Sequence, residues 1–363
     1  MRACVGWRGA GDPLLVIVRG VRDPVVRLDY RGRSDAGEAW IALRDADYAR
    51  GFTLDDGSPL SRLTLVRMGE EEWRFLWTWH HALLDGWSMS RVLGELLRVH
   101  DGETLPPAGG GPRQLARWRH QEDDAPHETF WRERLDSLSR PCLLHGTERV
   151  SDEQGAGAVD HVIPAGQVQA LRTVAARHKV TLNTLVQAAL AQVIANRTGN
   201  DRIAFGVTGS GRTADLPDIE NIIDLMVGTL PLVCDATPAL ETEAVKGEWL
   251  RGILADNIAM RQHEHAPPPA VQSWNDAPAA PFDTLMVFEN YPVDEALWHE
   301  VRGDLSFSDV GNRGGTSYPL TVIVVPRDTL SFHIEYRRAF FTREEAQAIL
   351  AALVERLLAM GEQ

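Results

Sequence analysis

The chain of 363 residues is poor in cysteine and has no long hydrophobic run. Its three cysteines, Cys4, Cys142 and Cys234, are far apart and show no CxxC spacing, which argues against a disulfide framework or a zinc site. No segment approaches the ~20 consecutive apolar residues that cross a bilayer, and the N-terminus has no basic-then-apolar leader. These absences predict a cytoplasmic protein with reduced thiols and no membrane partner.

Positive charge is also scarce. The chain has 37 Lys and Arg residues against 51 Asp and Glu residues, which gives a formal net charge of −14. Lys179 and Lys246 are the only lysines, a bias that indicates a GC-rich genome rather than a function. An acidic protein is a poor nucleic-acid binder, because basic patches supply most of that affinity. The length and the 44% hydrophobic content fit one large domain or two smaller ones.

The most informative stretch is HHALLDGWS, which runs from His80 to Ser88. The aromatic run 73–79 before it predicts a strand. The apolar residues after it repeat at helical spacing, with Ser88 or Ser90 as the predicted N-cap. The two histidines therefore lie where a strand ends and a turn enters a helix. Such a position suits catalysis, since an imidazole exchanges protons near neutral pH.

The residues alone leave three interpretations of the histidine pair. One ring acts in chemistry, or both rings are satisfied polar groups that close a strand, or the pair binds a metal. Neighbouring strand residues point to opposite faces, so His80 and His81 would not bind one ion without distortion. The same alternation predicts that one ring faces a site while the other supports the fold, and we expect no metal.

The stretch matches HHxxxDGWS, a signature of condensation domains from nonribosomal peptide synthetases within the chloramphenicol-acetyltransferase-like superfamily. The chain resembles that family in further segments that occur in the family's order: FTL at 52–54 with PLSRL at 59–63, VTLNTLVQ at 180–187, FGVTGSGR at 205–212, FDTLMVFENYPV at 282–293 and SYPLT at 317–321. Acyltransferases and epimerisation domains also carry HHxxxDG. The ordered set is far more specific than that motif alone.

The resemblance implies an α+β fold in which two chloramphenicol-acetyltransferase-like lobes form a V-shaped pseudo-dimer with a tunnel between them. We expect an N-terminal lobe at 1–146 that carries HHxxxDG, a linker at 147–160 and a C-terminal lobe at 161–363. Relatives have an extra strand and helix before the segment that the first residues match, so the first lobe is expected to be truncated at its start.

Local patterns predict individual elements in both lobes. Strands are predicted at 73–79, 203–207, 230–234, 285–288, 320–325 and 330–336, and helical patterning at 130–138, 167–197, 249–262 and 342–358. Thr342 is the predicted N-cap of the last helix, with Glu345 completing a capping box.

The resemblance also implies roles for site residues. His81 is the central catalytic residue, accompanied by His80 and by Gly86, whose backbone N–H lies near the reacting groups. Asp85 has a structural role at the site and pairs with Arg2. Further residues are expected to line the tunnel and contact substrate: Trp87, Ser88, Gly228, Asn290, Tyr291, Ser317 and Tyr318. Two positions depart from the family's GLFINTLPV run, since Asp224 replaces its first glycine and Gly228 its asparagine.

The implied function is a condensation-type acyltransferase of nonribosomal peptide or related natural-product biosynthesis. It joins a carrier-protein-bound acyl or peptidyl thioester to an amine or hydroxyl acceptor. The implied partners are donor and acceptor carrier proteins and small-molecule acyl and amine substrates. No tightly bound cofactor is expected, because substrates travel on the carriers' 4'-phosphopantetheine.

Several alternatives stay open. The chain could be a non-catalytic module that docks carrier proteins, or an inactive truncated relic. It could also be an epimerisation domain or a coenzyme A-dependent acyltransferase. We expect a monomer or a part of a larger assembly.

Overall fold

The computed structural model describes these residues: 3–7, 13–18, 25–107, 110–146, 149–153, 155–236, 242–274, 280–289, 305–308, 311 and 313–361. The chain divides into two compact units. The first unit comprises residues 1–111 and 221–225, and the second comprises 112–220 and 226–363. The short segment 221–225 therefore belongs to the first unit although its neighbours in the sequence belong to the second.

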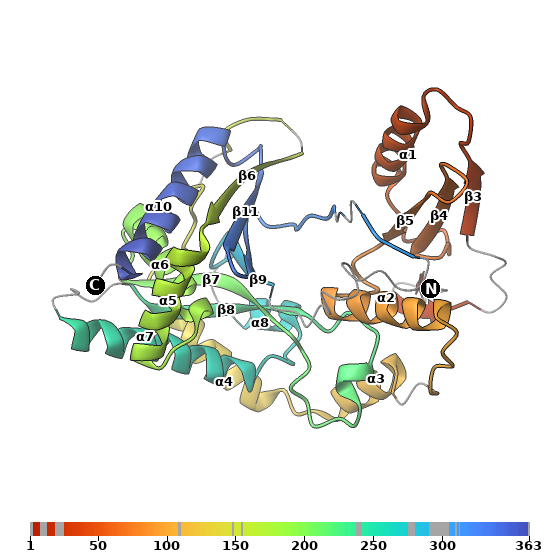
Figure 1. Cartoon of the computed structure of the whole chain (residues 1–363). Helices are drawn as coiled ribbons and strands as arrows, with labels where there is room; N and C mark the ends of the chain where they lie inside the picture. The colour runs from red at the N-terminus through yellow and green to blue at the C-terminus, as the bar shows by residue number, and fades with distance from the viewer. Residues whose placement is uncertain are drawn as a thin grey trace. The chain divides into compact units, whose positions relative to one another are not determined.

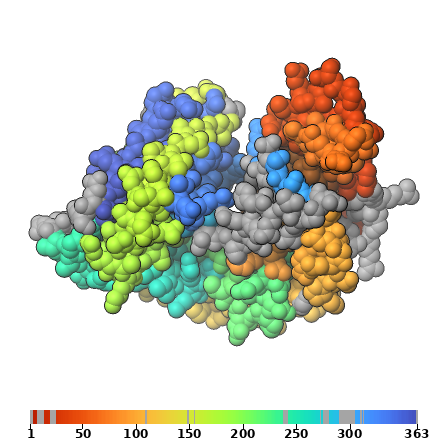
Figure 2. Space-filling model, viewed as in Figure 1, coloured from red at the N-terminus to blue at the C-terminus, as the bar shows by residue number. Residues whose placement is uncertain are grey.

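Among its described residues, the first unit forms two small sheets and two helices, which Figure 1 draws in red to orange. Its elements are β1 (Ala3–Trp7), β2 (Pro13–Ile17), β3 (Val25–Asp29), α1 (Ala36–Arg50), β4 (Ser61–Arg67), β5 (Trp73–Trp79) and α2 (Gly86–His100). β1 and β2 form an antiparallel pair, while β4 pairs with β3 in parallel and with β5 in antiparallel fashion. The atoms of β3, β4, β5 and α1 form one continuous body in the space-filling view (Figure 2).

A buried apolar cluster of the first unit lies beneath the turn that follows β5. It consists of Ala3, Leu60, Leu83 and Leu84, with the half-buried Ile223 packed against it. Helix α1 adds no buried residue. The apolar residues on one face of α1, among them Trp40 and Leu43, are only half-buried, so polar contacts also hold the helix on its sheet.

The second unit is built on a six-stranded mixed sheet. Its strands, in spatial order, are β6 (Ala156–Ile163), β11 (Leu330–Arg337), β10 (Leu320–Pro326), β9 (Thr284–Phe288), β7 (Arg202–Gly209) and β8 (Gly228–Asp235). β9 runs parallel to β10 and to β7, and the other neighbours are antiparallel. Side chains of β11 alternate between buried and half-buried, as expected of a strand with one face on the core.

The second unit also contains the helices α3 (Pro112–Gln121), α4 (Ala125–Asp136), α5 (Ala165–His178), α6 (Leu182–Thr198), α7 (Glu243–Arg261), α8 (Pro268–Ser273) and α10 (Arg343–Gly361). Of these, α6, α7, α8 and α10 contact strands of the sheet (Figure 1). A 3-10 turn lies at Ile219–Asn221. Every residue of α6 from Thr184 to Ile194 is buried, because the helix packs against α5, α7, α10 and β7. A helix surrounded in this way is largely apolar on all sides, and its buried polar residues, such as Gln187, need hydrogen-bond partners.

The α+β fold predicted from the sequence is confirmed, and the predicted strands and helices occur close to their expected positions. Lys179 interrupts the predicted helical stretch 167–197 in a left-handed conformation, so two helices form there. The capping box is confirmed. The Thr342 N–H donates to Glu345 Oε2 at 2.8 Å, and the Glu345 N–H donates to Thr342 Oγ1 at 3.2 Å. The V-shaped arrangement of lobes stays a prediction.

The division into units differs from the predicted domain boundaries. Residues 112–146 pack with the second unit, whereas the sequence assigned them to the first lobe. Compact units need not coincide with the family's lobes, so the linker at 147–160 stays a prediction. All three cysteines are buried and unpaired. Among the described helices, none has the length and apolar character to cross a membrane.

Candidate active site

The histidine turn is fixed on both sides of His81. The His80 N–H donates to Leu60 O at 2.9 Å, and the Leu83 N–H donates to His80 O at 3.0 Å. The Ala82 N–H donates to His80 Nδ1 at 3.1 Å. The His81 side chain is exposed at the tip of this turn. The backbone around His81 is therefore held while its ring is open to a reactant.

His80 supports the turn. Since Nδ1 accepts a hydrogen bond from Ala82, the neutral ring carries its proton on Nε2. The ring lies nearly perpendicular to Phe52, with 6.2 Å between centroids. His80 thus serves the fold, while the expectation that His81 faces a site stays a prediction. The catalytic roles of His80 and His81 stay predictions.

Asp85 is the N-cap of α2. It is 2% exposed, and Oδ1 accepts a hydrogen bond from the Ser88 N–H at 2.8 Å. The prediction of Ser88 or Ser90 as N-cap is therefore wrong. A carboxylate at this position also meets the positive end of the helix dipole. Arg2 lies outside the described residues, so its pairing with Asp85 stays a prediction.

Gly86 and Trp87 form the start of α2. Gly86 is the first helical residue, and the first amides of a helix have no acceptor within it. Helical dihedral angles are open to all residues, so the described conformation does not itself require glycine at this position. Trp87 is half-buried beside Gly86. The expected contacts of both residues with reacting groups stay predictions.

Ser88 is buried and ties α2 to the segment 221–225. Its Oγ donates to Asp224 O at 2.8 Å and accepts from the Asp224 N–H at 3.1 Å. Both bonds use the backbone of residue 224, so the aspartate that departs from the family pattern does not alter them. The hydroxyl has a structural use here, and its contact with substrate stays a prediction. Sequence reasoning missed this connection, because no local pattern links positions so far apart.

The expected substrate residues of the second unit fall into two groups. Gly228 begins β8, and its neighbour Thr229 shares a side-chain hydrogen bond with Tyr318. The Tyr318 ring stacks on Phe282 with 6.0 Å between centroids. Burial raises the pKa of Tyr318 against the opposing effect of that hydrogen bond. Gly228 and Tyr318 are therefore close neighbours, whereas Ser317 is exposed beside them. Asn290 and Tyr291 lie outside the described residues.

Gly211, in the FGVTGSGR run at 205–212, has a conformational reason to be glycine. Its φ is +65°, in the left-handed region, and a Cβ there would overlap the carbonyl of Met226. By contrast, a Cβ added at Gly228 would meet nothing within 4 Å. The structure requires glycine at 211 for the backbone and leaves open space at 228.

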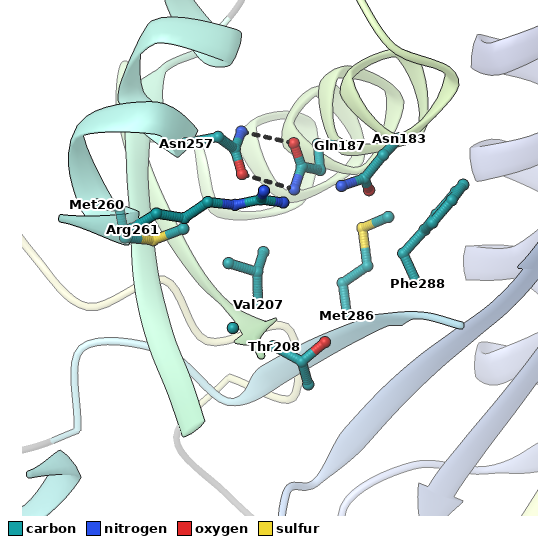
Figure 3. Close-up of a pocket in the computed structure, with 10 residues that line it drawn as sticks. Asn183, Gln187, Val207, Thr208, Asn257, Met260, Arg261, Met286 and Phe288 are labelled. Carbon is teal, nitrogen blue, oxygen red and sulfur yellow. Dashed lines mark hydrogen bonds between the residues drawn. The ribbon is translucent and has the colours of Figure 1, made fainter. Parts of the chain in front are cut away.

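The VTLNTLVQ segment lines a small pocket in the second unit, with a cavity volume of about 20 Å³ (Figure 3). The Gln187 and Asn257 carboxamides lie in its wall and exchange two hydrogen bonds of 3.1 and 2.7 Å. Oδ1 of Asn183 is buried there without a hydrogen-bond partner. The motif's polar residues thus face a small cavity between α6, α7, β7 and β9, a grouping that the sequence did not predict.

Comparisons with known proteins identify the family of this chain. The sequence model of the Condensation domain family matches residues 9–363. A linear gramicidin synthase protein of Brevibacillus parabrevis is 32% identical over 379 residues, covering 100% of this chain and 5% of that protein. Chondramide synthase cmdD of Chondromyces crocatus is 32% identical over 381 residues, covering 100% of this chain and 9% of that protein. The chain thus spans less than a tenth of the length of either relative.

Solved structures with the same fold include condensation domains. The starter condensation domain of rhizomide synthetase aligns with a TM-score of 0.76 at 18% identity, covering 100% of this chain and 82% of that one. The first condensation domain of the calcium-dependent antibiotic synthetase aligns with a TM-score of 0.73 at 17% identity, covering 99% and 84%. With the family match over nearly the whole sequence, these findings establish that the chain belongs to the condensation-domain family of nonribosomal peptide synthetases.

Proposed function

We propose that the chain catalyses condensation of a carrier-bound acyl or peptidyl thioester with an amine or hydroxyl acceptor. The observation that carries the proposal is the HHxxxDG turn, which presents an exposed His81 on a backbone held at His80, Ala82 and Leu83. An enzyme that joins two tethered reactants needs an accessible polar group on a rigid support.

The reaction consists of attack on the thioester carbonyl. The nucleophile's nitrogen or oxygen forms a bond to the carbonyl carbon, the carbon–sulfur bond breaks, and the carrier thiol leaves with a proton. His81 removes the proton of the attacking group or holds that group by a hydrogen bond. General-base assistance contributes roughly 10²–10⁴-fold, and positioning can contribute as much. Because a thioester is already activated, we propose that a large share of the rate enhancement by His81 comes from positioning the attacking group.

Acyl transfer gives either an amide or an ester, and the acceptor decides which of the two forms. An amine acceptor gives an amide, and a hydroxyl acceptor gives an ester. We propose that donor and acceptor both arrive on 4'-phosphopantetheine arms of carrier proteins. Under this proposal the chain needs no tightly bound cofactor of its own.

The test is mass-spectrometric detection of product from a panel of acyl- and aminoacyl-loaded carrier proteins. We expect His81→Ala to lower the yield by about 100-fold or more, since it removes both the proton acceptor and the positioning contact. His100→Ala is the matched control, because His100 is an exposed histidine at the far end of α2. It should leave the yield unchanged.

Three outcomes would contradict the proposal in different ways. Unchanged yield with His81→Ala would remove the role of His81. No product from folded wild-type protein across a broad panel would favour a docking module. Consumption of free acyl-coenzyme A without carriers would favour a coenzyme A-dependent acyltransferase.

A further inference from the structure

Arg62 on β4 is held rigidly at the end of α1. Its Nε donates to Asp47 Oδ1 at 2.9 Å, and Nη2 donates to Asp47 Oδ2 at 3.2 Å. Nη2 also donates to Asp47 O at 3.0 Å, and Nη1 donates to Gly51 O at 2.7 Å. Thr78 on β5 adds a hydrogen bond to the same carboxylate. Such a bidentate, charge-assisted arrangement fixes the plane of the guanidinium.

This polar cluster is protected from water. The Asp47 side chain is 14% exposed and the Arg62 side chain is 20% exposed. Burial opposes ionisation of Asp47, but hydrogen bonds from Arg62 and Thr78 outweigh it and lower the pKa of the carboxyl group. The aspartate is therefore charged at neutral pH. The cluster attaches α1 to the sheet alongside the half-buried apolar residues Trp40 and Leu43 of that helix.

Phe52 connects the cluster to the histidine turn. The Arg62 guanidinium carbon lies 4.2 Å from the centroid of the Phe52 ring, in cation–π geometry. The same ring also contacts His80, at 6.2 Å between centroids and an angle of 80° between planes, and it packs against the apolar cluster around Leu60. Aromatic pairs favour perpendicular arrangements at this separation. A continuous set of contacts thus runs from Asp47 through Arg62 and Phe52 to His80.

His80 in turn sets the geometry next to His81. Its Nδ1 accepts the Ala82 N–H, which follows His81 directly in the chain. Rotation of the His80 ring would break this bond and release the peptide on the C-terminal side of His81. Only Phe52 packs against the His80 ring as an aromatic neighbour among the described residues.

We propose that Asp47, Arg62 and Phe52 are positioning residues that orient the His80 ring and thereby hold His81 in its working geometry. They act through His80 and need no contact with substrate. The expected effect on kcat rests on the proposed function. The expected effect on the His80 ring does not, because it concerns only the structure around His80.

The first experiment compares Phe52→Leu with Phe52→Tyr in the full chain. Leucine removes the ring but keeps an apolar side chain, and tyrosine restores the ring. Loss of positioning should lower kcat for condensation by about 10-fold or more and change KM less than about twofold. Phe52→Tyr should return kcat to within about twofold of wild type. A merely structural role for Phe52 would not separate kcat from KM in this way.

Arg67→Lys supplies the matched control for Arg62→Lys. Arg67 lies on the same strand and also stacks on an aromatic ring, with its guanidinium carbon 5.3 Å from the Trp73 centroid. That stack is at the opposite end of β4 from the histidine turn. Arg62→Lys should lower kcat, and Arg67→Lys should leave it unchanged.

A second readout does not depend on activity. In protein labelled with ¹⁵N-histidine, nuclear magnetic resonance should show His80 as a fixed Nε2–H tautomer in wild type and in Arg67→Lys. Phe52→Leu and Arg62→Lys should give a mixture of tautomers at His80, at temperatures where both variants remain folded. A substitution His80→Gln assigns the signal.

The two readouts separate this proposal from the proposed function. An unchanged His80 signal in both folded variants would overturn the positioning role, whatever the activity. A changed signal with unchanged kcat in active enzyme would overturn it as well. If wild-type protein forms no product, a changed signal supports the positioning of His80, and only the condensation activity has failed.

Discussion

At the scale of single residues, hydroxyl groups only two positions apart perform different tasks. Ser88 Oγ bonds to both backbone groups of Asp224, 136 residues away in the sequence. Ser90 Oγ donates to Gly86 O at 2.9 Å within the same helix. A buried bond between distant segments stabilises the fold more than a bond to the preceding turn of the same helix. The latter bond is lost at little cost, because solvent or another side-chain rotamer provides an alternative partner.

Replacing Ser88 should therefore destabilise the first unit locally. We expect Ser88→Ala to lower the free energy of unfolding by about 1–3 kcal/mol, because two backbone groups of Asp224 lose their buried partner. Hydrogen exchange at residues 221–225 should accelerate in this variant.

Ser90→Ala is the matched control for that prediction. It removes a hydroxyl from the same helix without touching Asp224 and should leave exchange at 221–225 unchanged. Equal exchange rates in the two variants would refute the assigned role of Ser88.

At the scale of elements, the pairing of β6 with β11 creates a charged cluster. Register places His333 directly opposite Asp160, and Glu335 lies two residues further along the same face of β11. His333 Nδ1 lies 2.6 Å from Asp160 Oδ1, and Nε2 lies 3.5 Å from Glu335 Oε1. Hydrogen bonds to Glu335 and Asp160 outweigh burial and raise the pKa of His333 to about 9.

This pKa predicts a pH dependence of stability. The folded state binds the proton more tightly than the unfolded state, whose pKa is near 6.5. The stabilisation is fully present below pH 6.5 and is lost as the pH rises through about 9. We expect the free energy of unfolding to fall across this window in wild type and to flatten in His333→Gln.

An NMR titration of His333 checks the cause. Asp160→Asn should lower the pKa of His333, because it removes a charged acceptor. A wild-type titration midpoint near 6.5 would show that the cluster does not stabilise the protonated ring.

At the scale of the whole molecule, the chain leaves the first unit after Gly111 and returns to it at 221–225. The returning segment contributes Ile223 to the apolar cluster at Leu60, Leu83 and Leu84, and Asp224 to the bonds with Ser88. The first unit is therefore not a continuous piece of sequence.

Residues 1–111 expressed alone should be less stable than the same unit in the full chain. The fragment lacks 221–225, and a small unit has little buried area to lose. We expect urea unfolding followed by circular dichroism to show a lower midpoint or no cooperative transition. Residues 112–363, which contain the large buried core of the second unit, should keep a cooperative transition.

Adding a peptide of residues 219–227 should raise the midpoint of the 1–111 fragment. An equal midpoint in the fragment and the full chain would show that the segment contributes nothing to the first unit.

Periodicity and short motifs predicted much of this protein. Apolar, aromatic and helical patterns predicted β5, β7, β8, β10, β11 and α10, because short apolar runs between turns favour strands and helical spacing favours a helix. The capping box at Thr342 was readable because both of its bonds lie within one turn. HHxxxDGWS, with the motifs that follow in order, predicted the family.

The sequence by itself determined the family, many of the strands and helices, and the place of His81 at the end of a strand. Only the tertiary structure decided that Asp85 rather than a serine caps α2, that Ser88 bonds to Asp224, and that Phe52 packs on His80. The physical reason is the distance along the chain over which each kind of contact acts. Local patterns depend on neighbours within a turn or a strand, whereas these contacts depend on strand register and on segments that are distant along the chain.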